Sequence, residues 1–157
     1  MADHPVIGHV HLKVSDLDRA VAFYRDVLGM ELQQRYGRGA AFLSWGGYHH
    51  HIGLNIWESR GGSSPAPGTT GLFHLAILYP SRKALAQALV RVLQSGTELD
   101  GAADHGVSEA IYFRDPDNNG IEIYRDRPEG EWPRENGELM MVSDPLDLEA
   151  LLAEAEA

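Results

Sequence analysis

One pattern of apolar residues, helix caps and glycines occurs twice along the 157-residue chain, and this duplication restricts the fold more than any other feature. In the first copy, residues 7–14 alternate like a β-strand, and Asp16 can cap the helix that follows. This helix is predicted to end at Gly29 and to bury Leu17, Val21, Tyr24 and Leu28. Three short strands are expected next, over residues 31–35, 40–45 and 50–57.

The pattern restarts after residues 59–71, a stretch rich in Gly, Ser and Pro that is typical of a linker. Residues 72–79 form the next predicted strand, and Ser81 can cap a helix that ends at Gly96. The apolar residues of this helix are Leu85, Leu89, Val92 and Leu93. Strands are then expected over residues 110–114 and 120–125, joined by the turn DPDNN.

Each copy is therefore predicted to be a βαβββ module, and the fold class is predicted to be α+β. One such module buries too little surface to be comfortable alone, so two modules are expected to pair their sheets. We expect a single domain over residues 1–157. Its parts are module one at 5–58, a linker at 59–71, module two at 72–127 and a tail at 128–157.

The tail is predicted to contain a short acidic helix, because leucines at 148, 151 and 152 recur at helical spacing. Ser143 or Asp144 is the expected N-cap, with Pro145 in the first turn. We interpret this helix as a lid or a subunit contact.

Composition and charge exclude several classes of function. The formal charge of −10, from 23 acidic and 13 basic residues, argues against a nucleic-acid partner and favours a small-molecule substrate. No apolar run approaches the length of a membrane-spanning helix, and the first ten residues do not resemble a secretory signal. We therefore expect a cytoplasmic protein with no membrane partner. Because the chain has no cysteine, any metal ligands must be His, Asp or Glu.

Two histidines occupy equivalent positions in the two copies. Superposing the copies aligns His9 with His74, each at the entrance of a first strand, and aligns Gly53 with Glu122. Two imidazoles and one carboxylate form a three-ligand site with open positions, the arrangement used by non-haem Fe(II) oxygenases. His11 is the rival ligand, because strand alternation places it on the same face as His9.

Two longer motifs resemble those of the vicinal oxygen chelate superfamily, which includes glyoxalase I, fosfomycin and bleomycin resistance proteins, and extradiol ring-cleavage dioxygenases. HVHLKVSDLDRAVAFYRDVLGMEL resembles its opening unit and IYFRDPDNNGIEIY its closing hairpin, within a resemblance that covers residues 7 to about 127. It implies paired βαβββ modules forming a curved sheet around a metal cleft. It also implies that His9, His74 and Glu122 are the metal ligands.

Further residues favour the extradiol branch. Glyoxalase-like members carry a fourth protein ligand at the position of Gly53, and glycine cannot bind a metal through a side chain. The stretch DHGVSEAIYFRDPDNNGIE resembles the extradiol signature and implies that His105 and Tyr112 are catalytic. In the turn of this signature, Asn118 occupies a position where glycine is common. The sequence therefore does not determine the backbone geometry of the turn just before Glu122.

The stretch YHHHIGLN resembles the strand entrance that carries the extradiol acid/base histidine, and it implies His50. Strand alternation instead places His49 and His51 on the face of Gly53. A bulge, or a strand that starts after His50, would reconcile the two. As the candidate acid/base residue, we rank His50 first and His51 second.

The resemblance implies an extradiol (catechol 2,3-) dioxygenase. Its cofactor would be Fe(II), with Mn(II) as a second choice, and its partners a catecholic substrate and O2. A homodimer is left open. The alternatives are a glyoxalase-like lyase or isomerase, or a thiol transferase, that uses another divalent metal, and a drug-sequestering resistance protein.

Overall fold

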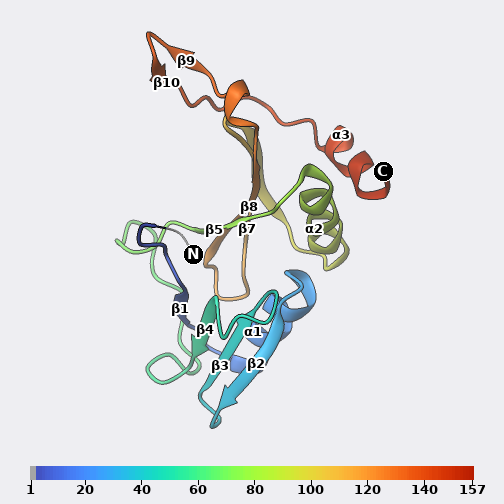
Figure 1. Ribbon diagram of the computed structural model, residues 1–157. Coiled ribbons are helices and arrows are strands. Elements are labelled where there is room, and N and C mark those ends of the chain that lie inside the picture. Colours follow the sequence, from blue (N-terminus) through green and yellow to red (C-terminus); the bar gives the residue numbers. More distant parts are fainter. Residues whose placement is uncertain (1–2) are drawn as a thin grey trace. The chain divides into compact units, whose positions relative to one another are not determined.

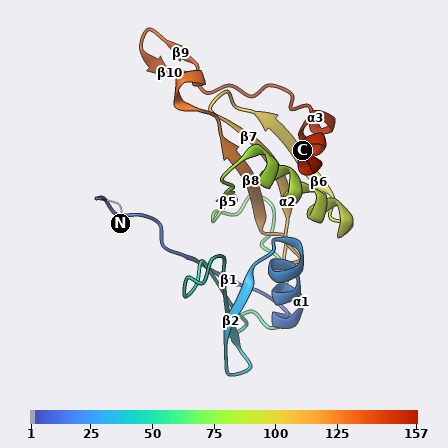
Figure 2. The same cartoon turned by 45° about the vertical axis from the view of Figure 1, so that its right-hand side comes forward.

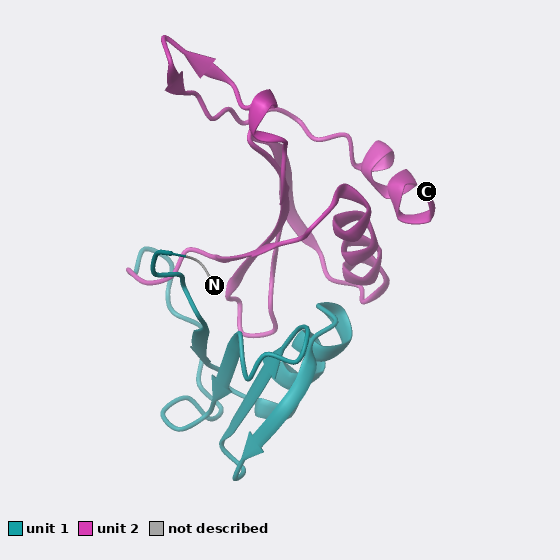
Figure 3. Cartoon of the chain, in the orientation of Figure 1, with its two compact units in different colours: residues 1–69 teal, residues 70–157 magenta. Residues whose placement is uncertain are grey.

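The computed structural model describes residues 3–157 and divides the chain into two compact units, residues 1–69 and 70–157 (Figure 3). The boundary falls inside the Gly-, Ser- and Pro-rich stretch of residues 59–71. Each unit contains one of the two predicted βαβββ modules, which confirms the mixed α+β class (Figure 1).

Unit 1 is an open four-stranded sheet with one helix. Its elements are β1 (Val10–Lys13), α1 (Leu17–Ala22), the π-helical turn η1 (Phe23–Val27), β2 (Glu31–Tyr36), β3 (Ala40–Ser44) and β4 (Ile52–Asn55). The strand order is β1-β4-β3-β2, with β1 parallel to β4 and the other pairs antiparallel. As predicted, the Asp16 side chain caps α1 by accepting the N–H of Arg19 at 3.0 Å. The four predicted core residues of this helical segment are all buried.

Unit 2 repeats this arrangement. Its module consists of β5 (Leu75–Leu78), α2 (Arg82–Gln94), β6 (Leu99–Asp104), β7 (Ser108–Arg114) and β8 (Gly120–Asp126). The strand order is β5-β8-β7-β6, and α2 packs along one face of this sheet (Figure 2). Ser81 caps α2 by accepting the N–H of Ala84 at 3.1 Å, as predicted. Of the four apolar residues named for α2, Leu85, Leu89 and Val92 are fully buried, whereas Leu93 is 42% exposed.

The strands pair in the same register within each of the two sheets. In unit 1, β1 and β4 are parallel and place His11 opposite Gly53. In unit 2, β5 and β8 are parallel and place Ala76 opposite Glu122. Gly53 and Glu122 are therefore equivalent positions, as the sequence repeat predicts. His9 and His74 are equivalent in the same way, because each directly precedes the first residue of its strand.

The C-terminal segment, residues 128–157, belongs to unit 2. It contains η2 (Glu129–Glu131), the hairpin of β9 (Arg134–Glu135) and β10 (Glu138–Leu139), α3 (Leu148–Ala153) and η3 (Glu154–Glu156). The predicted cap of α3 is wrong: Asp147 caps it, because the backbone of Asp144 pairs instead with Asp104. The helix packs on α2 through the fully buried Leu151. Within residues 3–157, no helix is long and apolar enough to cross a membrane.

Candidate active site

In unit 2, the side chain of His74, directly before β5, meets that of Glu122 on the neighbouring strand β8. His74 Nε2 lies 2.9 Å from Glu122 Oε2, and the two side chains are 29% and 13% exposed. Gly120 lets the entrance of β8 approach this place, because a Cβ there would lie 2.2 Å from the carbonyl oxygen of Phe73. An imidazole nitrogen and a mostly buried carboxylate at this separation fit two positions in the coordination sphere of a divalent metal.

The turn that leads into β8 is organised by the buried carboxylate of Asp115. Its Oδ1 accepts the N–H groups of Asp117 and Asn119 at 2.9 and 2.8 Å, and its Oδ2 accepts the Asn119 side-chain amide at 2.9 Å. Asn118 adopts a φ of 65°, a left-handed conformation that asparagine tolerates better than most residues. The turn therefore keeps its shape with asparagine in place of glycine, and Glu122 follows it in a fixed position.

Tyr112 and His105 extend this pair into a row of hydrogen-bonded side chains. His105 Nε2 lies 2.7 Å from the Tyr112 hydroxyl oxygen, which in turn lies 3.4 Å from Glu122 Oε1. Burial, together with the neighbouring Glu122 carboxylate, raises the pKa of Tyr112 to about 12. The phenol therefore keeps its proton at neutral pH and acts as a hydrogen-bond donor.

A mostly apolar cavity of about 280 Å³ opens beside His74 and Tyr112. Gly101 lines it, and a Cβ on this residue would meet no atom within 4 Å. Asp100 and Arg114 also line the cavity, but they neutralise each other through a contact of 3.0 Å. The space suits an apolar group of a small molecule better than a charged one.

In unit 1, His9 and His50 lie side by side. Their ring centroids are 4.4 Å apart, and the rings of His50 and Phe42 meet in an edge geometry with their centroids 5.1 Å apart. This arrangement is possible because β4 begins only at Ile52, so strand alternation does not govern the direction of His50. Burial, followed by the charge of His9 and the other neighbouring histidines, lowers the pKa of His50.

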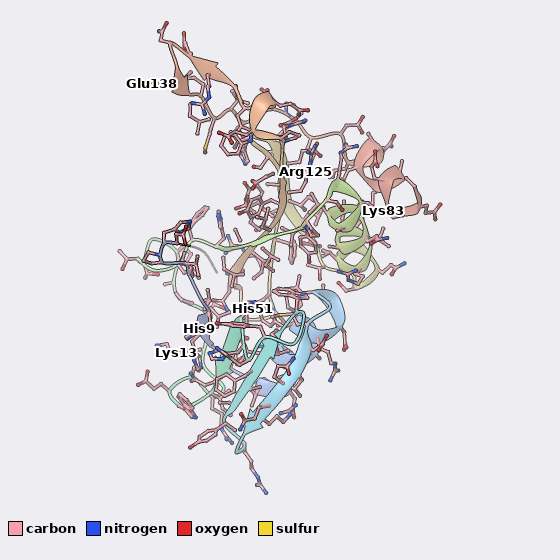
Figure 4. The ribbon with its side chains drawn as sticks, viewed as in Figure 1. His9, Lys13, His51, Lys83, Arg125 and Glu138 are labelled. Carbon is pink, nitrogen blue, oxygen red and sulfur yellow. The ribbon has the colours of Figure 1, made fainter. Side chains whose placement is uncertain are left out.

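The rival histidine His51 packs elsewhere within unit 1. Its Nδ1 accepts the backbone N–H of Trp45 at 3.3 Å, and its ring lies against Trp45 and Tyr48. Figure 4 shows His9 and His51 where the chain enters β1 and β4. The ring contacts thus distinguish His50, which lies beside His9, from His51, which packs on an aromatic pair.

The other rival, His11, has both ring nitrogens directed at its own module. Nε2 lies 2.9 Å from the Asn55 amide nitrogen, and the Nδ1 side of the ring covers Gly53. Asn55 is oriented by a second bond, because its Oδ1 accepts the N–H of Trp57 at 3.1 Å. His11 is therefore engaged in contacts within its own module.

The three expected metal ligands are divided between the units. His9 belongs to unit 1, whereas His74 and Glu122 belong to unit 2. In the part of the chain that the structure describes, no group of three or more His, Asp or Glu side chains is arranged to hold a metal ion. The structure thus brings together one pair of expected ligands, and the complete set of three stays a prediction.

A model of the Glyoxalase/Bleomycin resistance protein/Dioxygenase superfamily matches residues 6–123 of the chain. The chain is 39% identical over 151 residues to a catechol-2,3-dioxygenase of Bacillus subtilis, across 95% of this chain and 52% of that protein. It is 29% identical over 130 residues to a lactoylglutathione lyase of Salmonella typhimurium, across 78% of this chain and 93% of that enzyme. The chain thus spans about half of the dioxygenase but nearly the whole lyase.

Among solved structures, the fold is similar to a glyoxylase/bleomycin resistance protein/dioxygenase domain from Frankia sp. EAN1pec. The TM-score is 0.65 and the identity 23%, across 80% of this chain and the full length of that domain. At this level of identity the likeness concerns the fold alone.

Proposed function

The chain belongs to the glyoxalase/bleomycin resistance protein/dioxygenase superfamily, and on that premise we propose that it is an extradiol ring-cleavage dioxygenase acting on catechol-type aromatic diols. The observation that carries the proposal is the row of side chains in unit 2. It joins a metal-binding pair, His74 and Glu122, to a hydrogen-bonding pair, Tyr112 and His105. The 39% identity to a catechol-2,3-dioxygenase supports the same choice.

His9, His74 and Glu122 would hold the metal, which we propose to be Fe(II), with Mn(II) as the second choice. Two imidazoles and one carboxylate are the donor set of mononuclear non-haem Fe(II) oxygenases. When bound, the metal supplies the redox chemistry that lets an aromatic diol react with dioxygen. The protein's own residues position the substrate and move its protons.

His50 is the proposed acid/base, because it lies beside the expected ligand His9. Its Nδ1 lies 2.8 Å from Nδ1 of His49. With the proton of the neutral His50 ring on Nδ1 and donated to His49, Nε2 would take a proton from a substrate hydroxyl and return it later. In unit 2, the hydroxyl of Tyr112 and the ring of His105 would hydrogen-bond a substrate oxygen near Glu122.

A glyoxalase-like lyase using another divalent metal is the second candidate, because the chain covers 93% of a lactoylglutathione lyase. Its chemistry is expected to use a fourth protein ligand at position 53, as the resemblance to glyoxalase-like members implies. Gly53 has no side chain, and the ring of His11 fills the space in front of it. This contact favours the dioxygenase.

Oxygen uptake tests the proposal directly. The protein loaded with Fe(II) under anaerobic conditions is expected to consume one O2 per catechol when oxygen is admitted, and to form a yellow ring-opened semialdehyde. Replacing His50 with glutamine should slow turnover by about 10²- to 10⁴-fold and leave the iron in place, while His4→Gln serves as the control. Full iron occupancy without oxygen uptake, combined with oxygen-independent conversion of a hemithioacetal, would instead establish the lyase.

A further inference from the structure

Residues 142–144 of the C-terminal segment run along the end of β6, the edge strand of the sheet in unit 2, and form an isolated antiparallel bridge there between Asp104 and Asp144. The N–H of Asp104 donates to the carbonyl of Asp144 at 2.8 Å, and the N–H of Asp144 donates back at 2.9 Å. The N–H of Val142 donates to the carbonyl of His105 at 3.0 Å. The C-terminal segment therefore runs directly beside a proposed catalytic residue.

Val142 also contacts the ring of His105. Its carbonyl oxygen lies 2.8 Å from His105 Nδ1. A carbonyl oxygen can only accept a hydrogen bond, so Nδ1 must carry a proton. In the neutral ring the lone pair then lies on Nε2, 2.7 Å from the Tyr112 hydroxyl. The single proton of Tyr112 is therefore donated to His105 rather than to Glu122, whose carboxylate oxygen is 3.4 Å away.

We infer that the Val142 carbonyl is a positioning group, which fixes the tautomer and the orientation of His105 and through it the direction of the Tyr112 hydroxyl. The catalytic consequence rests on the proposed function, whereas the tautomer assignment does not. Nε2 becomes the one ring nitrogen of His105 that can accept a proton, and it faces the metal-binding pair through Tyr112. The C-terminal segment is thus part of the site and not only a cover for the sheet edge.

Contacts on both sides of residue 142 hold this carbonyl in place. A Cβ at Gly106 would lie 2.6 Å from Pro133 and 3.3 Å from Val142, so glycine allows the segment to approach β6. After residue 144, α3 is fixed on α2 by the buried Leu151, and Glu154 in η3 bonds Arg82 at 3.1 Å. The carbonyl position is therefore determined by packing within unit 2.

The tautomer can be read by ¹⁵N NMR of the histidine side chains, with the metal-free protein and again with diamagnetic Zn(II). We expect His105 to show a protonated Nδ1 and an unprotonated Nε2. Val142→Pro and Asp144→Pro each delete an N–H that joins the segment to β6, and both should produce averaged nitrogen signals. Ser143→Pro is the matched control, because the alternation of an antiparallel edge directs the N–H of residue 143 away from β6.

With Fe(II), the two disruptive variants should lose about tenfold in kcat, as expected for one misplaced hydrogen bond, with unchanged iron content and little change in KM. A wild-type protein with its proton on Nε2 of His105 would overturn the inference, and this measurement needs no variant to fold. Unchanged signals in folded Val142→Pro and Asp144→Pro would also overturn it. Absence of oxygen uptake by a wild-type protein that shows the expected tautomer would reject the proposed function alone.

Discussion

The imidazole of His11 lies across Gly53, so that a Cβ at residue 53 would be 2.8 Å from Nδ1 of His11. The equivalent pair in unit 2 is reversed in size, with Ala76 opposite Glu122. Each module therefore places one large and one small residue at this pair of positions. A glutamate at residue 53 therefore fits without rearrangement only if His11 is replaced by a smaller residue.

Gly53→Glu and the double variant Gly53→Glu/His11→Ala test this relationship. The single variant is expected to lower the free energy of unfolding by about 1–3 kcal/mol, because the His11 ring must move out of a packed position. The double variant copies the Ala76–Glu122 pair, so it should recover stability, bind metal more tightly and lose oxygen uptake. Urea denaturation and an oxygen electrode measure these effects. Full dioxygenase activity in the double variant would show that residue 53 does not face the metal.

Replacing any of the three proposed ligands is expected to remove most of the bound metal, because two remaining donors form a poor chelate. The variants are His9→Ala, His74→Ala and Glu122→Gln, and the metal content after gel filtration is the measurement. His11→Ala is the control, since that ring is engaged by Asn55. Metal loss in His11→Ala together with retention in His9→Ala would exchange the roles of these two histidines.

The sequence predicts the modules well because their signals are local. Asp16 and Ser81 cap the two helices as expected, since each accepts an N–H three residues ahead. The repeat also predicts the equivalence of Gly53 and Glu122, because equal spacing in two copies of one module implies equal register. The placement of His50 beside His9 depends on where β4 begins, and the sequence leaves that start open.

Other features could not be predicted, because they depend on contacts between residues far apart in the chain. β6 has the sequence LDGAAD, which lacks the apolar alternation of a strand and is fixed by its pairing with β7. The bond between Val142 and His105 joins residues 37 positions apart and leaves no local pattern. The role of Asp115 in the predicted turn could have been inferred from the sequence, since an aspartate at the start of a turn commonly accepts the N–H groups that follow it.

Gly101→Leu is expected to change substrate preference by filling the cavity beside His74 and Tyr112. The new side chain enters open space, so stability should change by less than about 0.5 kcal/mol. For catechols with an alkyl or aryl substituent, kcat/KM should fall by about tenfold or more, whereas for catechol itself it should change little. Gly130→Ala, also in open space, is the control. An equal loss for both substrates would show that the substituent does not occupy this cavity.

Asp104→Asn is expected to remove a pH-dependent part of the stability of unit 2. The hydrogen bond from Arg127 is the largest cause that lowers the pKa of Asp104 below its ordinary value of 3.8, and the two side chains are 25% and 24% exposed. Because the folded pKa is the lower one, the contribution is fully present above 3.8 and is lost as the pH falls through the folded value.

The cost of Asp104→Asn at pH 7 should be about 1–2 kcal/mol, since solvent reaches part of this pair but the bond to a charged group is well formed. Asparagine can still accept the N–H of Gly106 through its side-chain oxygen, so the variant isolates the charge. Urea denaturation from pH 7 to pH 3 should show the difference from wild type shrinking as the solution becomes acidic. Asp100→Asn, which breaks a more exposed pair with Arg114, should cost less than about 0.5 kcal/mol. A difference that stays constant across this pH range would mean that Asp104 acts through packing and not through its charge.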